Sequence, residues 1–235
     1  MSLDKLYAGL RFADVHEDLY RNIVSLRKSV DLFDDLSPNR ADWDSAIAVE
    51  MQVKQTIFTS TTPIIHRPFE EAIWFSAIGY PYKKWMESRY SDGTFGIWYG
   101  ASDIHTSAYE TVCHWIKFLS DAGNLNSGVK QERQIYLIQC DALLLDFRPL
   151  VTKFPKLISK ADYSFTQQIG TRLHREEHPG LVTKSARYDG DVYAILNSNV
   201  LSNPRHSCFL TYKIRNKNMI DVERTPGTLW FSIPI

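Results

Sequence analysis

Cysteine is scarce in this chain, and the three that occur, Cys113, Cys140 and Cys208, stand far apart. This spacing excludes a CxxC pair and a paired disulfide framework, and it favours a reducing, intracellular compartment. The N-terminal stretch lacks the apolar segment of a secretory signal peptide. No run approaches the ~20 apolar residues of a membrane-spanning helix, so we expect a cytoplasmic protein without a membrane partner.

Net charge is lacking as well, because 27 basic residues balance 27 acidic ones. General nucleic-acid-binding proteins usually carry a basic excess, so no direct nucleic-acid partner is expected. A small anionic ligand stays possible, since it needs only one or two arginines. The balance is uneven along the chain: residues 1–50 hold 6 basic and 10 acidic residues, a net of −4, while residues 151–235 hold 12 and 7, a net of +5.

The common nucleotide motifs are missing too. No GxGxxG follows a predicted strand, and no Walker A sequence occurs. A nucleotide, if this chain uses one, is therefore held without a Rossmann or P-loop cradle. Ser185 beside Lys184 could suggest a hydrolase dyad, but the GxSxG elbow of a nucleophilic serine is absent.

One pattern of metal ligands is present, the run HREEH from His174 to His178. It matches the inverted zinc-protease motif, in which two histidines one helical turn apart bind zinc. Pro179 follows at once, which places the second histidine at a helix end, where basic residues suit the helix dipole. The helix-end interpretation is favoured, and no metal is predicted.

The apolar pattern divides the chain at about residue 60. Before it, apolar residues at spacings of three and four predict a helix over residues 15–33, and a second helix is expected over 41–57. After it, short β-rich runs dominate, with helices expected over residues 102–119 and 163–177. The predicted fold class is therefore α+β with a helical N-terminal extension. The predicted strands are Pro63–His66, Phe95–Ala101, Ile135–Cys140, Leu143–Phe147, Gly180–Ser185, Val192–Leu196, Cys208–Ile214 and Leu229–Ile233.

Three residues of possible chemical importance lie between positions 85 and 115. Arg89 precedes a turn, Tyr99 lies on a predicted strand, and Glu110 lies on the helix that follows. A purely structural interpretation of Glu110 is also available, because its spacing from Ser107 is that of a capping box and its spacing from His114 is that of a helix pair. Glu110 lies off the apolar face of its helix, so it is not a core residue.

This segment resembles the RES domain family, named for an arginine, a glutamate and a serine. The resemblance rests on several short motifs, and it covers residues of about 61–215. Those motifs are the pair His66 and Arg67, the step Ser88–Arg89–Tyr90, the strand end Tyr99–Gly100–Ala101, the triplet Ala108–Tyr109–Glu110, the triplet Gln168–Ile169–Gly170, and the run GLVTKS from Gly180 to Ser185.

The resemblance implies a fold like the diphtheria-toxin type of ADP-ribosyltransferase and an enzyme that consumes NAD as its substrate, with no separate cofactor. Arg67 and Arg89 would bind the diphosphate, because arginine binds phosphates bidentately. Tyr99 would stack on the nicotinamide. Glu110 would stabilise positive charge on the ribose as the glycosidic bond breaks. Ser185 would hold a ribose or phosphate oxygen, or fix the neighbouring arginine.

The resemblance also implies a biological setting, the toxin of a bacterial toxin–antitoxin pair with an Xre-like antitoxin as partner. Two alternatives stay open: a protein ADP-ribosyltransferase using the same site, and an inactive module that binds a nucleotide or a partner. We expect residues 1–60 to form the helical extension and residues 61–235 the NAD-processing domain. The sequence does not indicate the oligomeric state.

Overall fold

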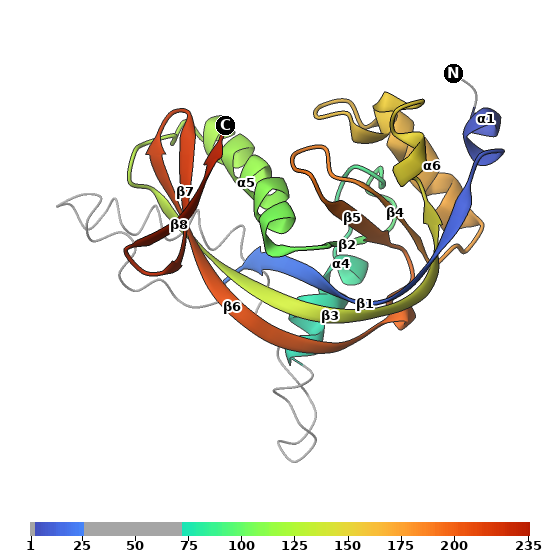
Figure 1. Cartoon of the computed structure of the whole chain (residues 1–235), viewed down its shortest axis with the longest axis horizontal. Helices are drawn as coiled ribbons and strands as arrows, with labels where there is room; N and C mark the ends of the chain where they lie inside the picture. The colour runs from blue at the N-terminus through green and yellow to red at the C-terminus, as the bar shows by residue number, and fades with distance from the viewer. Residues whose placement is uncertain (1–2, 26–71) are drawn as a thin grey trace, which may run out of the picture. The chain divides into compact units, whose positions relative to one another are not determined.

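The computed structural model describes residues 3–25 and 72–235, and its elements are labelled as in Figure 1. Within these residues the strands are β1 (Arg11–Val24), β2 (Trp98–Ala101), β3 (Lys130–Asp146), β4 (Gly180–Lys184), β5 (Asp191–Ile195), β6 (Leu201–Asn216), β7 (Met219–Thr225) and β8 (Thr228–Pro234). The α-helices are α1 (Leu3–Tyr7), α4 (Tyr80–Lys83), α5 (Ile104–Asp121) and α6 (Ser164–Arg175). Shorter helical turns are the π-helix η2 (Phe75–Gly79) and the 3₁₀ turns η3 (Arg148–Leu150), η4 (Pro155–Ile158) and η5 (Ser198–Val200). A search of the described helices finds no candidate for a membrane-spanning segment.

The chain forms two compact units, which we call unit 1 and unit 2. The described part of unit 1 comprises residues 3–21, 72–110 and 136–205, and that of unit 2 comprises residues 22–25, 111–135 and 206–235. Each unit is therefore assembled from several stretches of the chain. The predicted division at residue 60 stays a prediction.

Unit 1 contains a mixed sheet whose strands pair in the order β1–β2–β5–β4–β3 (Figure 1). β5 runs antiparallel to both of its neighbours, with Tyr99 opposite Ala194 and Thr183 opposite Val192. β3 and β4 are parallel, with Leu145 opposite Leu181. A mixed sheet with separate helices confirms the predicted α+β class. The likeness to the diphtheria-toxin type stays a prediction.

The core of unit 1 lies between this sheet and α6. α6 contributes Phe165, Ile169 and Leu173, which recur every four residues and therefore share one helix face. They pack with residues of the sheet such as Leu145 and Leu181. The expected helix over 163–177 is thus confirmed, with its end at Arg175.

The helix predicted over residues 15–33 is wrong where the structure describes it, because residues 11–24 form β1. Val15, Leu19 and Ile23 are buried, as the apolar pattern requires. Their spacing of four is an even number, so it places them on one face of a strand as well as on one face of a helix. The rest of this predicted helix, the helix over 41–57 and the strand Pro63–His66 lie outside the described residues.

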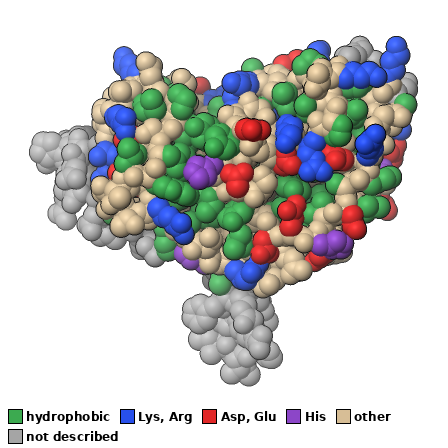
Figure 2. Space-filling model, viewed as in Figure 1, with side chains coloured by type: hydrophobic (Ala, Val, Ile, Leu, Met, Phe, Trp, Pro, Cys, Tyr) green, Lys and Arg blue, Asp and Glu red, His purple; other side chains and the backbone are tan. Residues whose placement is uncertain are grey.

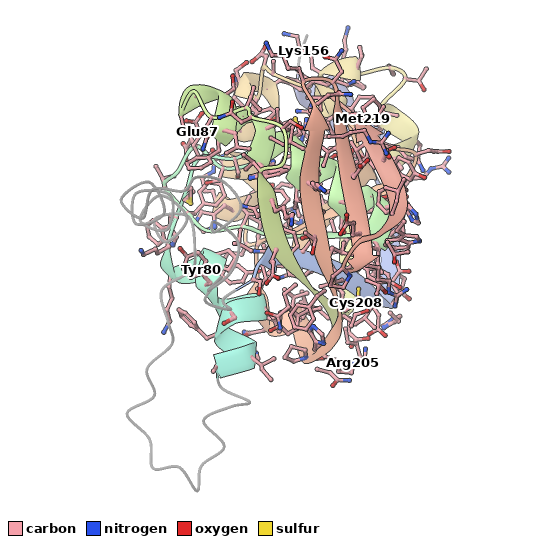
Figure 3. All side chains as sticks on the ribbon, turned by 90° about the vertical axis from the view of Figure 1, so that its left-hand side faces the viewer. Tyr80, Glu87, Lys156, Arg205, Cys208 and Met219 are labelled. Carbon is pink, nitrogen blue, oxygen red and sulfur yellow. The ribbon has the colours of Figure 1, made fainter. Side chains whose placement is uncertain are left out.

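Unit 2 contains β6, β7 and β8, which lie side by side and antiparallel (Figure 3). Its interior includes a buried arginine, Arg133, whose Nε donates to the Asn22 side-chain oxygen at 2.8 Å and whose Nη2 donates to the Asn22 carbonyl at 3.0 Å. β7 is missing from the predicted strands, although its run MIDVERT alternates charged and apolar residues as a half-exposed strand does. The predicted runs Ile135–Cys140 and Leu143–Phe147 form a single strand, β3.

Candidate active site

The centre of the candidate site is a hydrogen bond between Glu110 on α5 and Ser185, which follows β4 directly. The Ser185 hydroxyl donates to Glu110 Oε1 at 2.5 Å, and the Ala186 backbone N–H donates to the same oxygen at 3.2 Å. The Ser185 Oγ in turn accepts the backbone N–H groups of Arg187 and Tyr188 at 3.0 and 3.1 Å. Two incoming donors leave the hydroxyl proton directed at the carboxylate, so Ser185 holds Glu110 in place.

The second carboxylate oxygen of Glu110 is in a different situation. Glu110 is half-buried, and within residues 3–25 and 72–235 Oε2 has no hydrogen-bond partner. The capping-box interpretation does not apply, because Asp103 caps α5 by accepting the Thr106 N–H at 2.8 Å. Glu110 is therefore a carboxylate with one oxygen fixed by protein and one oxygen that can meet a ligand.

Arg89 lies on the loop between α4 and β2, shortly after Glu87, which is labelled in Figure 3. Its Nη1 donates to the Ser159 carbonyl at 2.6 Å, and its guanidinium lies 4.8 Å from the centre of the Tyr163 ring. No carboxylate among the described residues forms an ion pair with it. The cation is held by a carbonyl and an aromatic face, neither of which neutralises its charge.

Tyr99 supports the backbone beside Arg89. Its hydroxyl accepts the backbone N–H of Tyr90 at 3.0 Å and shares a hydrogen bond with the Ser88 hydroxyl at 2.9 Å. Burial raises the pKa of Tyr99 to about 12, so the phenol stays protonated at neutral pH. The stacking of Tyr99 on nicotinamide stays a prediction, and the contacts described here are those of a positioning residue.

Tyr90, which follows Arg89 directly, has a fully buried side chain. Burial is the main reason that the pKa of Tyr90 is raised. The positive charge of Arg89 opposes that rise, and the negative charge of Glu110 adds to it. Arg89, Tyr99, Glu110 and Ser185 all belong to unit 1, where Ser185 is bonded to Glu110 and Tyr99 to the backbone beside Arg89. Arg67, also predicted to bind a phosphate, lies outside the described residues.

Two site residues escape the sequence prediction. Tyr163 lies against Arg89 as described, and Arg187 donates from Nη2 to the Lys160 carbonyl at 2.7 Å. A signal for Arg187 exists in its position two residues after Ser185, at the end of a predicted strand. The sequence does not mark Tyr163 as a site residue, because its position is simply that of the start of the helix that follows.

The HREEH run behaves as a helix end. α6 stops at Arg175, and the His178 N–H donates to the Leu173 carbonyl at 3.0 Å in the terminal turn. The His174 ring stacks on Phe95 with centroids 4.3 Å apart. Over the part of the chain that the structure describes, no group of three or more metal-ligating side chains occurs.

Tyr99→Phe is expected to lower the free energy of unfolding by about 1–3 kcal/mol, because it leaves the buried Tyr90 N–H without an acceptor. Thermal or urea unfolding measures this loss. Tyr188→Phe is the matched control, since Tyr188 is 39% exposed and its loss of a hydroxyl should change little. Equal stability of the two variants would mean that the Tyr99 hydroxyl does not support this loop.

Charged side chains of both signs are interspersed over the face of the molecule drawn in Figure 2, as the zero net charge suggests. No broad surface of one sign is seen in that view.

Comparison with known proteins gives three findings. The model of the RES domain family matches residues 63–217, which is more than half of the chain. A search of curated proteins finds no match. Among solved structures, a chain of the M. tuberculosis MbcT–MbcA toxin–antitoxin complex is similar at 13% sequence identity and a TM-score of 0.46, over 87% of this chain and 91% of that chain. On the extent of the family match, this chain belongs to the RES domain family.

Proposed function

We propose that this chain cleaves the nicotinamide–ribose bond of NAD and acts as the toxin of a bacterial toxin–antitoxin pair. The observation that carries the proposal is the state of Glu110, with Oε1 held by Ser185 and Ala186 and with Oε2 unpartnered among the described residues. A fixed carboxylate is suited to stabilise the positive charge that develops on a ribose ring. Membership of the RES domain family supports NAD as the substrate.

Cleavage of the nicotinamide–ribose bond requires little proton transfer by the protein. When the bond between ribose C1′ and the nicotinamide nitrogen breaks, the bonding electron pair leaves with nicotinamide, which becomes a neutral molecule. The positive charge passes to the ribose as an oxocarbenium-like species, which Glu110 stabilises. An oxygen of water or phosphate then forms the new bond to C1′. A water that attacks also releases one proton to solvent.

Arg89 supplies the complementary charge for the rest of the substrate. The diphosphate of NAD is anionic, and an arginine without a carboxylate partner in the described residues is a suitable binding group. Tyr99 keeps the Arg89–Tyr90 backbone in position through its hydrogen bond to the Tyr90 N–H. The family resemblance adds an Xre-like antitoxin as the expected protein partner.

Full-length protein incubated with NAD is expected to release nicotinamide together with ADP-ribose, or with ADP-ribose phosphate when phosphate is the acceptor. Chromatography with mass spectrometry identifies these products. An added ADP-ribose on a protein side chain would instead favour the ADP-ribosyltransferase alternative. Intact NAD in the presence of folded protein would contradict both, and saturable NAD binding without turnover would favour a binding module.

A further inference from the structure

Arg187 is anchored to the same serine that holds Glu110. Its backbone N–H donates to Ser185 Oγ at 3.0 Å, while the Ser185 hydroxyl donates to Glu110. The backbone of Arg187 is thus fixed beside the candidate carboxylate. The function proposed above assigns no role to Arg187.

The side chain of Arg187 extends to the segment that also receives Arg89. Arg187 Nη2 donates to the Lys160 carbonyl at 2.7 Å, and Arg89 Nη1 donates to the Ser159 carbonyl at 2.6 Å. These carbonyls belong to consecutive residues, so both guanidinium groups lie against one short piece of backbone. One of these cations comes from the loop before β2 and the other from the turn after β4.

Neither guanidinium has a carboxylate partner among the described residues, whereas Arg148, Arg172 and Arg205 of unit 1 each form an ion pair. Arg148, by comparison, lies 2.8 Å from Asp146 and 2.9 Å from Asp191, and Arg172 lies 2.8 Å from Glu176. Like charges repel when they are close and unneutralised, so the pair favours the arrival of an anion.

A second observation points to a missing acceptor. The Nε of Arg187 is buried and has no hydrogen-bond partner among the described residues. Buried donors of charged groups are almost always paired in folded proteins, and an orphaned one indicates an acceptor that has yet to be supplied. The Nε and an Nη of one arginine form the fork that receives two oxygens of a phosphate.

We propose that Arg187 and Arg89 together form a binding site for a diphosphate, with Arg187 as a substrate-binding residue that the RES motifs of this chain do not include. The inference rests on the proposed function in that NAD is the diphosphate expected there. Two linked phosphates match two guanidinium groups held at neighbouring carbonyls. A ligand phosphate would replace the Lys160 carbonyl as the acceptor for Arg187.

The test is calorimetric titration of the full chain with ADP and with adenosine. Arg187→Gln is expected to raise the Kd for ADP by about 10- to 100-fold, the value of a charge-assisted hydrogen bond, and to leave adenosine binding unchanged. Arg187→Lys keeps the charge without the fork and should give an intermediate Kd. Arg175→Gln, which removes an exposed arginine of α6, should bind ADP as the wild type does.

Turnover separates this inference from the proposed function. Arg187→Gln should raise the KM for NAD about tenfold or more, with cleavage of nicotinamide riboside, which has no phosphate, unchanged. Wild-type protein that binds ADP through Arg187 without cleaving NAD would refute the proposed function alone. ADP binding that is absent in the wild type, or equal in the wild type, Arg187→Gln and Arg187→Lys, would overturn the diphosphate site. Thermal unfolding verifies that each variant is folded.

Discussion

Glu110→Gln is expected to lower the kcat for NAD cleavage by about 10²- to 10³-fold, the usual effect of removing one electrostatic stabiliser of a transition state. Glutamine has the shape of glutamate without its charge. Its amide oxygen can still accept the Ser185 hydroxyl and the Ala186 N–H, which are the two bonds that Glu110 Oε1 accepts. The fold should therefore survive, while the group proposed to meet the ribose changes from an anionic oxygen to a neutral NH₂.

The measurement is a single-turnover or steady-state assay of nicotinamide release, with thermal unfolding as the check on folding. Glu177→Gln serves as the matched control, because it removes an exposed carboxylate beyond the end of α6. Its activity should equal that of the wild type. If Glu110→Gln kept more than half of the wild-type kcat, the carboxylate would have no part in the reaction.

Gly170→Ala is expected to destabilise the protein by about 1–3 kcal/mol, as overpacking typically does. A loss of stability is the opposite of the usual effect of this substitution, because alanine in the middle of a helix usually stabilises a protein by about 1 kcal/mol relative to glycine. A Cβ at position 170 would lie 1.7 Å from the Tyr90 carbonyl oxygen and 2.7 Å from its carbon. Backbone cannot rotate away as a side chain can, so α6 and the Tyr90 loop must separate.

The effect of Gly170→Ala should reach the site, because Tyr90 adjoins Arg89. We expect a lower Tm, by about 2–4 °C for each kcal/mol in a chain of this size, together with a higher KM for NAD. Thr171→Ala, an exposed change on the same helix, should leave both quantities nearly unchanged. A rise in Tm for Gly170→Ala would show that the close approach of α6 to Tyr90 does not exist in solution.

The extent to which sequence predicts this molecule differs between local and non-local features. The helices around Glu110 and around Ile169 are predictable, since their apolar residues recur with helical spacing over more than two turns. β1 is mistaken for a helix because Val15, Leu19 and Ile23 satisfy both periods. Such ambiguity is resolved only by the neighbouring strand, where Tyr20 pairs with Ala101.

The candidate site shows the same division. Arg89, Tyr99, Glu110 and Ser185 are identified through short motifs, yet no spacing rule indicates that Ser185 donates to Glu110 across 75 positions. Glu110 could have been a capping residue, and only the bond between Thr106 and Asp103 shows that α5 is capped elsewhere. Arg187 depends on the Lys160 carbonyl, a backbone atom that carries no residue identity, so sequence cannot reveal the contact.

The hydrogen bond between Ser185 and Glu110 also has a consequence for the order of synthesis. Glu110 is translated 75 residues before its partner, which corresponds to about 4–15 s at ribosomal rates of about 5–20 residues per second. Until the turn after β4 has emerged and folded, the carboxylate has neither the hydroxyl nor the N–H that hold it. If the proposed function holds, a nascent chain should be inactive for most of its translation, and its activity should begin only after Ser185 and Ala186 have bonded to Glu110.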